Sequence, residues 1–244
     1  MIPKIIHFCW MSGNPYPTDI KKCIDSWKKI LPDYEIKLWD TNSFDINSSI
    51  WVKEAFEQKK YAFCADYIRL YALFNYGGIY LDSDVEVIKS YNNLLDLPYF
   101  MGFESTNVIE AATIATEKNN PFIKECLDYY KDRHFIVNGK MDTLFMPKIL
   151  MGVLEKKYKI KKISSKKEFD YSEGVINLFP FDFFSPIDST GKRYVLRQSE
   201  NTYSIHHFAS AWVDWKVMLL VKILGVNSPL RFKLQKIAKK IFKK

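Results

Sequence analysis

The chain has 244 residues and a net charge of +8, and 48% of its residues are hydrophobic and 16% aromatic. This hydrophobic content excludes an intrinsically disordered chain, and the length suffices for one large domain with its own core. The positive charge is concentrated at the end of the sequence, because residues 231–244 contain seven basic residues and no acidic one. The basic excess therefore describes a tail and not the body of the protein.

The four cysteines are widely spaced and form no C-x-x-C pair, and Cys9 and Cys64, which lie in apolar runs, are expected to be buried free thiols. The first residues lead directly into a strand-like run, so no signal peptide is expected. No stretch of about 18 uncharged apolar residues occurs, and a membrane-spanning helix is not expected either. Together these features favour a protein of the reducing cytoplasm.

The start of the chain predicts a strand, a helix and a second strand. Residues 3–10 (PKIIHFCW) are apolar and rich in β-branched side chains, which is typical of a short buried strand. Apolar residues then recur at helical spacing after Thr18, the expected N-cap, until Pro32 ends the helix. Residues 34–39 (YEIKLW) alternate as in a strand. This order predicts a parallel α/β sheet.

Two consecutive helices are expected between about residues 50 and 76, the second with the sequence YAFCADYIRLYALFNY. Gly77 and Gly78 end that helix, because glycine most easily adopts the left-handed conformation of a C-terminal cap. Residues 79–81 (IYL) then form a short buried strand, and Asp82-Ser83-Asp84 follows at its carboxyl end. The later expected elements are strands near 99–103 and 112–115, helices over 121–131 and about 142–156, and an aromatic, irregular stretch over 175–186.

Asp66 and Arg69 lie three residues apart on a helix that is apolar on nearly every side. Residues at this spacing share a helix face, and buried charges are costly unless they are paired. Two interpretations remain open. The two side chains form a structural ion pair, or both point into a polar cavity and bind a ligand rich in hydroxyl groups.

The D-x-D sequence of Asp82 and Asp84 gains its meaning from its position. In open parallel α/β sheets, ligands bind beyond the carboxyl ends of the strands. Alternate residues of an extended segment face the same way, so both aspartates can address one site. A carboxylate pair suits a hard cation such as Mg²⁺ or Mn²⁺, which would hold a diphosphate. The alternative is a pair of solvated turn aspartates.

Two adjacent histidines, His206 and His207, begin the late segment HHFASAW. With Ser210 and Trp212 they could complete a metal site and close over a ligand. Taken alone the segment is a weak indicator, because most histidines are simply hydrogen-bonded surface or core residues.

The segments IPKIIHFCW, ADYIRLYALFNYGGIYLDSD and HHFASAW together resemble the family 32 glycosyltransferases, which carry a sugar-binding region with a DXD motif. That family includes yeast-type α-mannosyltransferases and bacterial capsular polysaccharide transferases, and its core is similar to the large clostridial toxin glucosyltransferases. The resemblance extends from residue 2 to about residue 212. It implies a GT-A (Rossmann-like) α/β fold over residues 1–215, with a mixed, mainly parallel sheet flanked by helices.

The same resemblance implies a metal-dependent hexosyltransferase that retains the configuration of the sugar. The donor would be a UDP- or GDP-hexose, the cation Mn²⁺ or Mg²⁺, and the pathway bacterial capsular or cell-surface polysaccharide synthesis. By position, Trp10 would stack on the donor base, and Asp66 and Arg69 would hold sugar hydroxyls. Asp82 would bind ribose and sugar hydroxyls, and Asp84 would ligate the metal.

The late segment receives its roles from the resemblance as well. His207 and Ser210 would be further metal ligands, and Ser210 and Trp212 would contact the departing diphosphate. Some relatives carry an acidic residue in place of His207.

Residues 216–244 are expected to form a basic amphipathic helical extension. In residues 229–244 apolar and basic side chains interleave, which is typical of helices that lie on anionic membranes. A helix packed on the domain and a nucleic-acid-binding segment are the alternatives, of which we favour neither. A tail on the membrane would place the protein at the inner face of the membrane, where a lipid-linked saccharide could serve as acceptor.

Two other functions are compatible with parts of the sequence. A non-catalytic module that binds nucleotide sugars or carbohydrates could use the same scaffold. A basic membrane-surface adaptor would explain the tail but leaves Asp66, Arg69, Asp82 and Asp84 without a role.

Overall fold

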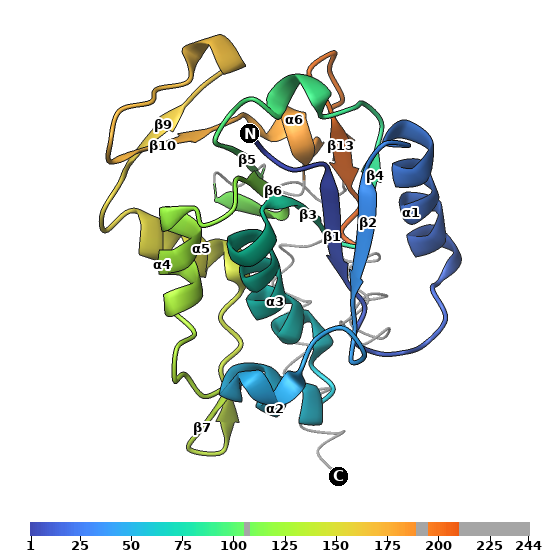
Figure 1. Ribbon diagram of the computed structural model, residues 1–244, viewed down its shortest axis with the longest axis vertical. Helices are drawn as coiled ribbons and strands as arrows, with labels where there is room; N and C mark the ends of the chain where they lie inside the picture. Colours follow the sequence, from blue (N-terminus) through green and yellow to red (C-terminus); the bar gives the residue numbers. More distant parts are fainter. Residues whose placement is uncertain (105–107, 189–194, 210–244) are drawn as a thin grey trace.

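The computed structural model describes residues 1–104, 108–188 and 195–209 (Figure 1). The predicted tail helix of residues 216–244, and with it the domain boundary at residue 215, lies outside this part of the chain. The helices are α1 Thr18–Ile30, α2 Ile50–Glu57, α3 Tyr61–Tyr76, α4 Pro121–Asp128, α5 Met146–Leu154 and α6 Phe181–Phe184. The strands are β1 Ile5–Cys9, β2 Glu35–Trp39, β3 Gly78–Leu81, β4 Val85–Val87, β5 Tyr99–Phe103, β6 Ile109–Thr116, β7 Ile136–Val137, β8 Lys140–Met141, β9 Lys159–Lys162, β10 Val175–Leu178, β11 Ile187–Asp188, β12 Val195–Leu196 and β13 Ser204–His206.

The central sheet has five strands in the order β2-β1-β3-β6-β5. Strand β1 pairs in parallel with both β2 and β3, whereas β6 runs antiparallel to its neighbours β3 and β5. Four strands therefore share one direction and β6 opposes them. This is the mixed, mainly parallel α/β sheet that the sequence predicted, and the fold class is confirmed.

Helices cover both faces of this sheet (Figure 1). On one face, Trp27 of α1 packs edge-on against Phe8 of β1, with ring centroids 5.2 Å apart. On the other face, Tyr71 of α3 packs against Trp39 of β2 at 5.9 Å. Because successive strand residues point to opposite faces, the apolar run of residues 3–10 serves both layers and lacks alternation.

Helix α3 lies in the interior of the protein, as its apolar sequence predicted. It ends at Gly77, whose φ of 67° is the left-handed value that glycine adopts without strain. A side chain at this position would also meet the backbone nitrogen of Lys118 at 2.7 Å. The chain therefore turns sharply from the helix into β3, which carries the D-x-D sequence at its end.

Two local predictions were wrong. Thr18 is the first residue of α1 and not its N-cap, which is Pro17 and offers no side-chain hydrogen bond. Residues 175–186, expected to be irregular, contain β10 and α6. Strand β10 pairs in parallel with β9, whose sequence KIKK carries too little hydrophobic pattern to identify it as a strand.

Strand β13 brings the late part of the chain to the D-x-D sequence. It pairs antiparallel with β4, so that His206 lies opposite Val85. Residues that are more than a hundred positions apart in the sequence thus meet at one end of the central sheet.

None of the helices formed by the described residues is long and apolar enough to cross a membrane.

Candidate active site

The D-x-D sequence occupies a tight turn between β3 and β4. The N–H of Asp82 donates to the carbonyl of Ala112 in β6 (2.9 Å), and the N–H of Val85 donates to the carbonyl of Asp82 (3.0 Å). These bonds fix the backbone of the turn against the neighbouring strand. Both carboxylates are therefore held at the carboxyl end of β3 by main-chain contacts that do not depend on a ligand.

Arg69 joins the helix pair to the D-x-D turn. Its Nη2 lies 3.0 Å from Oδ1 of Asp82 and 3.5 Å from Oδ1 of Asp66. Its Nη1 donates to the carbonyl of Ala111, and its guanidinium stacks over the ring of Tyr80 with 4.6 Å to the ring centroid. The structure thus brings Asp66, Arg69 and Asp82 together. The ion pair of the structural interpretation exists, although its shorter contact is to Asp82.

The burial of Asp66 disfavours its ionised form, which is unexpected for a carboxylate that only forms a structural ion pair. It is only 8% exposed, and burial raises its pKa to about 7 although the charge of Arg69 opposes that rise. The ionised form therefore lacks the solvation or pairing that would stabilise it. Perturbed carboxylates of this kind cluster at functional sites, where a ligand supplies the missing hydrogen bonds.

Asp82 lies between two donors at the base of the site. The hydroxyl of Tyr80 donates to Oδ1 of Asp82 at 3.0 Å, and Arg69 contacts the same oxygen. Burial raises the pKa of Asp82, with the neighbouring Asp84 adding to the rise and Arg69 opposing it.

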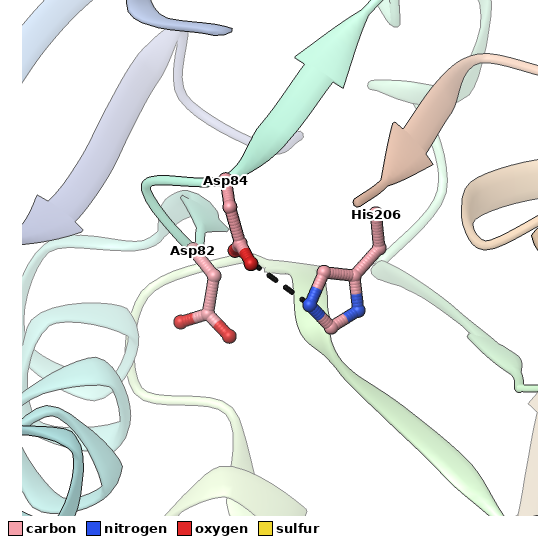
Figure 2. Close-up of side chains that lie close together, drawn as sticks. All are labelled: Asp82, Asp84 and His206. Atoms are coloured by element: carbon pink, nitrogen blue, oxygen red, sulfur yellow. Dashed lines mark ion pairs between the residues drawn. The ribbon is translucent and has the colours of Figure 1, made fainter. Parts of the chain in front are cut away.

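Asp84 faces His206 across the end of the sheet (Figure 2). Nε2 of His206 lies 3.6 Å from Oδ1 of Asp84, and the N–H of Ala209 donates to Oδ2 of Asp84 at 2.8 Å. Burial would raise the pKa of Asp84, but His206 and this N–H outweigh it and lower the pKa to about 2. Asp84 is therefore a carboxylate near neutral pH, the form that a cation needs.

Asp82, Asp84 and His206 form a group with metal-binding geometry. One potential ligand atom of each lies within 4.8 Å of those of the other two, and all three side chains are partly buried. Two carboxylates and an imidazole form a donor set that suits Mn²⁺ and other divalent first-row metals. The residues present fit a divalent cation.

His207 is placed differently from its predicted position at the metal. Its Nε2 lies 2.9 Å from Oε2 of Glu86, and both side chains are about two-fifths exposed. Its neighbour His206 takes the position beside Asp84, because adjacent residues of an extended segment point to opposite sides. The main-chain N–H of His207 donates to the carbonyl of Asp84 (3.1 Å), but its side chain faces Glu86 and not the carboxylates of the D-x-D turn. Ser210 and Trp212 lie outside the described residues.

Trp10 follows β1 at the same end of the sheet. Its indole N–H donates to the carbonyl of Asn14 (2.7 Å), and its ring packs edge-on against Tyr16 with centroids 5.1 Å apart. The side chain is partly buried. Trp10 thus lies at the carboxyl end of the strand next to β3, and its predicted contact with a nucleotide base stays a prediction.

The sequence predictions missed two members of this cluster, Tyr80 and Glu110, and they assigned the metal to His207 although His206 had been named beside it. Glu110 lies 2% exposed on β6, within hydrogen-bonding reach of His206. A signal for it was present, because Glu110 is the single charged residue of the apolar run 108–116 (VIEAATIAT). Tyr80 gave no comparable signal, since an aromatic residue in a strand is most often part of the core, and the sequence could not decide which of two adjacent histidines faces the site.

A D-x-D turn at the end of a buried strand, with an arginine and a further aspartate from the preceding helix, defines a candidate nucleotide-sugar site. Residues 17–101 match the model of the family described as glycosyltransferase sugar-binding region containing DXD motif. This range contains Asp66, Arg69, Asp82 and Asp84. The match confirms the resemblance to this glycosyltransferase family that the sequence predicted.

Three similar proteins have names that include a ceramide lipid. The chain is 34% identical over 130 residues to inositol phosphoceramide mannosyltransferase 3 of Schizosaccharomyces pombe, covering 50% of this chain and 35% of that protein. It is 29% identical over 173 residues to a mannosyl phosphorylinositol ceramide synthase of Saccharomyces cerevisiae, covering 65% and 44%. It is likewise 29% identical over 173 residues to lactosylceramide 4-alpha-galactosyltransferase of Mus musculus, covering 66% and 46%. The chain thus spans less than half the length of each of these relatives.

Among solved structures, the galactosyltransferase LgtC in complex with donor and acceptor sugar analogues has a TM-score of 0.47 and 16% sequence identity. That match covers 85% of this chain and 88% of the LgtC chain.

Proposed function

We propose that this protein is a metal-dependent glycosyltransferase that moves a hexose from a UDP- or GDP-sugar to a saccharide acceptor, with retention at the transferred carbon. The observation that carries the proposal is the cluster at the end of β3. There Arg69 contacts Asp66 and Asp82, and Asp84 lies beside His206, all within or next to the region that matches the family. An ion pair between Arg69 and its aspartates that served structure alone would not require Asp84 and His206 beside it.

The side chains divide into two groups with different tasks. Asp66 and Asp82, held by Arg69, would accept hydrogen bonds from sugar and ribose hydroxyls, since ionised carboxylates are acceptors only. Their fixed negative charge would also stabilise a sugar that gains positive character as its bond to the diphosphate breaks. The buried guanidinium of Arg69 would keep both carboxylates in place and leaves them little freedom to reorganise during the reaction.

Asp84 would hold the divalent cation together with a histidine of the 206–207 pair. His206 is favoured by its position beside Asp84. The resemblance named His207 and Ser210, and these assignments remain proposals. When bound, such a cation neutralises charge that develops on the departing nucleoside diphosphate. Trp10 would stack on the base, and Trp212 would contact the diphosphate.

The acceptor is proposed to be attached to a lipid. The similarity to enzymes whose names include inositol phosphoceramide and lactosylceramide supports this class of acceptor. A capsular or other cell-surface polysaccharide pathway would supply such an acceptor in a bacterium. A basic tail of residues 229–244 would hold the protein at the inner, anionic face of the membrane.

A non-catalytic module that binds nucleotide sugars is the second candidate. It would use the same residues, so the two functions differ in turnover and not in binding. The presence of Asp84 and a facing histidine favours catalysis, because binding of a sugar alone needs no cation site.

The test is donor turnover by the purified protein with Mn²⁺ and an Asp84→Asn variant. UDP-galactose, UDP-glucose, UDP-N-acetylhexosamines and GDP-mannose would be assayed for release of the nucleoside diphosphate. We expect turnover with one of these donors, a loss of at least 100-fold in Asp84→Asn, and near-normal turnover in Glu86→Gln, a more exposed neighbour on β4. No turnover with any donor, with nucleotide binding intact, would favour the binding module. Equal turnover in Asp84→Asn would refute the cation site.

A further inference from the structure

Glu110 is a buried carboxylate with no assigned task. It lies on β6, its side chain is 2% exposed, and its Oε1 accepts the N–H of Ala112 at 2.7 Å. Its second contact is with Nδ1 of His206, at 3.2 Å from Oε1 and 3.3 Å from Oε2. A buried carboxylate costs several kcal/mol unless charged or hydrogen-bonding groups compensate it. His206 is therefore a main group that compensates the buried charge of Glu110.

The register of the sheet brings Glu110 to the D-x-D turn. Leu81 pairs with Thr113 in the antiparallel ladder of β3 and β6, and the next bond joins Asp82 to Ala112. Glu110 lies two residues before Ala112 on β6, and the imidazole of His206 contacts both Glu110 and Asp84. The acid of β6 and the acid of the turn are thus placed on either side of the same space, into which His206 projects from β13.

The imidazole of His206 bridges the two carboxylates. Nε2 faces Asp84 (Figure 2), and Nδ1 faces Glu110, so each ring nitrogen has a different acid as its neighbour. Histidines that ligate metals almost always donate the N–H of the other ring nitrogen to a carboxylate, a carbonyl or water. Such a contact fixes the tautomer and the orientation of the ring and increases the basicity of the ligating nitrogen.

We propose that Glu110 is a positioning residue that holds His206 with Nε2 directed at the cation site of Asp84. This inference rests on the proposed function, because it assumes that the protein binds a divalent cation there. Glu110 would accept the Nδ1–H of His206 and leave Nε2 as the ligand atom. Glu110 itself would not contact the cation or the sugar.

The adjacent pair of Glu86 and His207 supplies a matched control. There too a glutamate contacts a histidine, at 2.9 Å, but both side chains are about two-fifths exposed. Exposed pairs contribute little to order, because water competes for the same hydrogen bonds. If a glutamate close to either histidine were enough to support cation binding, Glu110→Gln and Glu86→Gln would weaken it equally.

The experiment measures Mn²⁺ affinity by electron paramagnetic resonance of the free ion, in the presence of UDP and without turnover. Glu110→Gln keeps the shape of the side chain and an acceptor oxygen but removes the charge. We expect a 10- to 100-fold weaker Mn²⁺ affinity in Glu110→Gln, the range known for such outer partners. Glu110→Ala should lose at least as much, and Glu86→Gln should stay within about twofold of the unaltered protein.

A second measurement needs no variant and no activity. Nitrogen NMR of ¹⁵N-histidine-labelled protein, titrated with Zn²⁺ as a diamagnetic probe, should shift the Nε2 resonance of His206 while its Nδ1 stays protonated. A response at His207 instead would overturn the inference.

The outcomes separate the two levels of the argument. Unchanged Mn²⁺ affinity in Glu110→Gln, with clear loss in Asp84→Asn, would overturn the role of Glu110 and leave the proposed function standing. Unchanged affinity in Asp84→Asn as well would refute the cation site and with it the proposed function. If Glu110→Ala fails to fold, Glu110→Gln and the NMR titration decide.

Discussion

Asp66→Asn should stabilise the protein while it abolishes its function. Asp66 is 8% exposed, and its nearest cation is Nη2 of Arg69 at 3.5 Å. If the carboxylate of Asp66 served structure alone, its replacement by the neutral amide would make the protein less stable. A carboxylate kept for a ligand carries an unmet electrostatic cost in the free protein, and the amide removes that cost.

The magnitude follows from the pKa of Asp66, which burial raises from 3.8 to about 7. Because the pKa of Asp66 is higher in the folded state than in the unfolded state, ionisation of Asp66 lowers the free energy of unfolding as the pH rises from about 4 to about 7. Each pH unit in that window corresponds to about 1.4 kcal/mol, and so the full cost is about 4 kcal/mol above pH 7. Asp66→Asn removes this cost, but it also removes a charged hydrogen bond to Arg69, which contributes about 1.5–3 kcal/mol. We expect a net gain of about 1–3 kcal/mol at pH 8.

The assay is urea unfolding of both proteins at pH 8 and pH 5, with EDTA present so that no cation contributes. The advantage of Asp66→Asn should shrink by about 2–3 kcal/mol at pH 5, where Asp66 is already protonated in the folded state. Asp128→Asn, which breaks an exposed pair with Lys124, is the control and should change stability by less than about 1 kcal/mol. A loss of stability in Asp66→Asn at pH 8 would refute this reasoning and support a structural ion pair.

Three further predictions concern other parts of the chain. Trp10→Ala should weaken UDP or GDP binding about 5- to 100-fold in calorimetry, since stacking on a base contributes about 1–3 kcal/mol, while Tyr171→Ala, 72% exposed, should not; equal affinities would exclude the stacking role. His7 accepts the N–H of Trp39 at Nδ1 (3.2 Å) and contacts the carbonyl of Gly77 through Nε2 (2.8 Å), and burial lowers its pKa to about 4. The neutral form of His7 therefore contributes stability that is lost as the pH falls below 6.5. Between pH 7.5 and 5.5, the fall in the free energy of unfolding should be about 1.4 kcal/mol smaller in His7→Asn than in the unaltered protein. An unchanged pH dependence would contradict this prediction. Removal of residues 229–244 should abolish pelleting with anionic vesicles, and equal recovery with and without this tail would end the proposal of a membrane-bound tail.

The order of the first elements could be predicted from the sequence because local patterns specify it. The apolar run 3–10, the two glycines after α3 and the buried strand before Asp82 each carry a signal within a few residues. Such signals survive without tertiary contacts, since they reflect backbone preferences and burial. Strands β9 and β10 could not be predicted in this way, because the lysine-rich β9 becomes a strand only through pairing with a distant segment.

In the candidate site too, some relations follow from the local sequence and others from the tertiary structure. The sequence alone determined that Asp66 and Arg69 share a helix face and that Asp82 and Asp84 end a strand, because helix and strand periods fix these relations locally. Only the tertiary structure decided that Arg69 contacts Asp82, that the side chain of His206 and not that of His207 faces the carboxylate of Asp84, and that Glu110 contacts His206. Those contacts depend on the register of β6 and β13 against the D-x-D turn. A shift of one residue would turn each side chain to the other face, and no local pattern encodes that register.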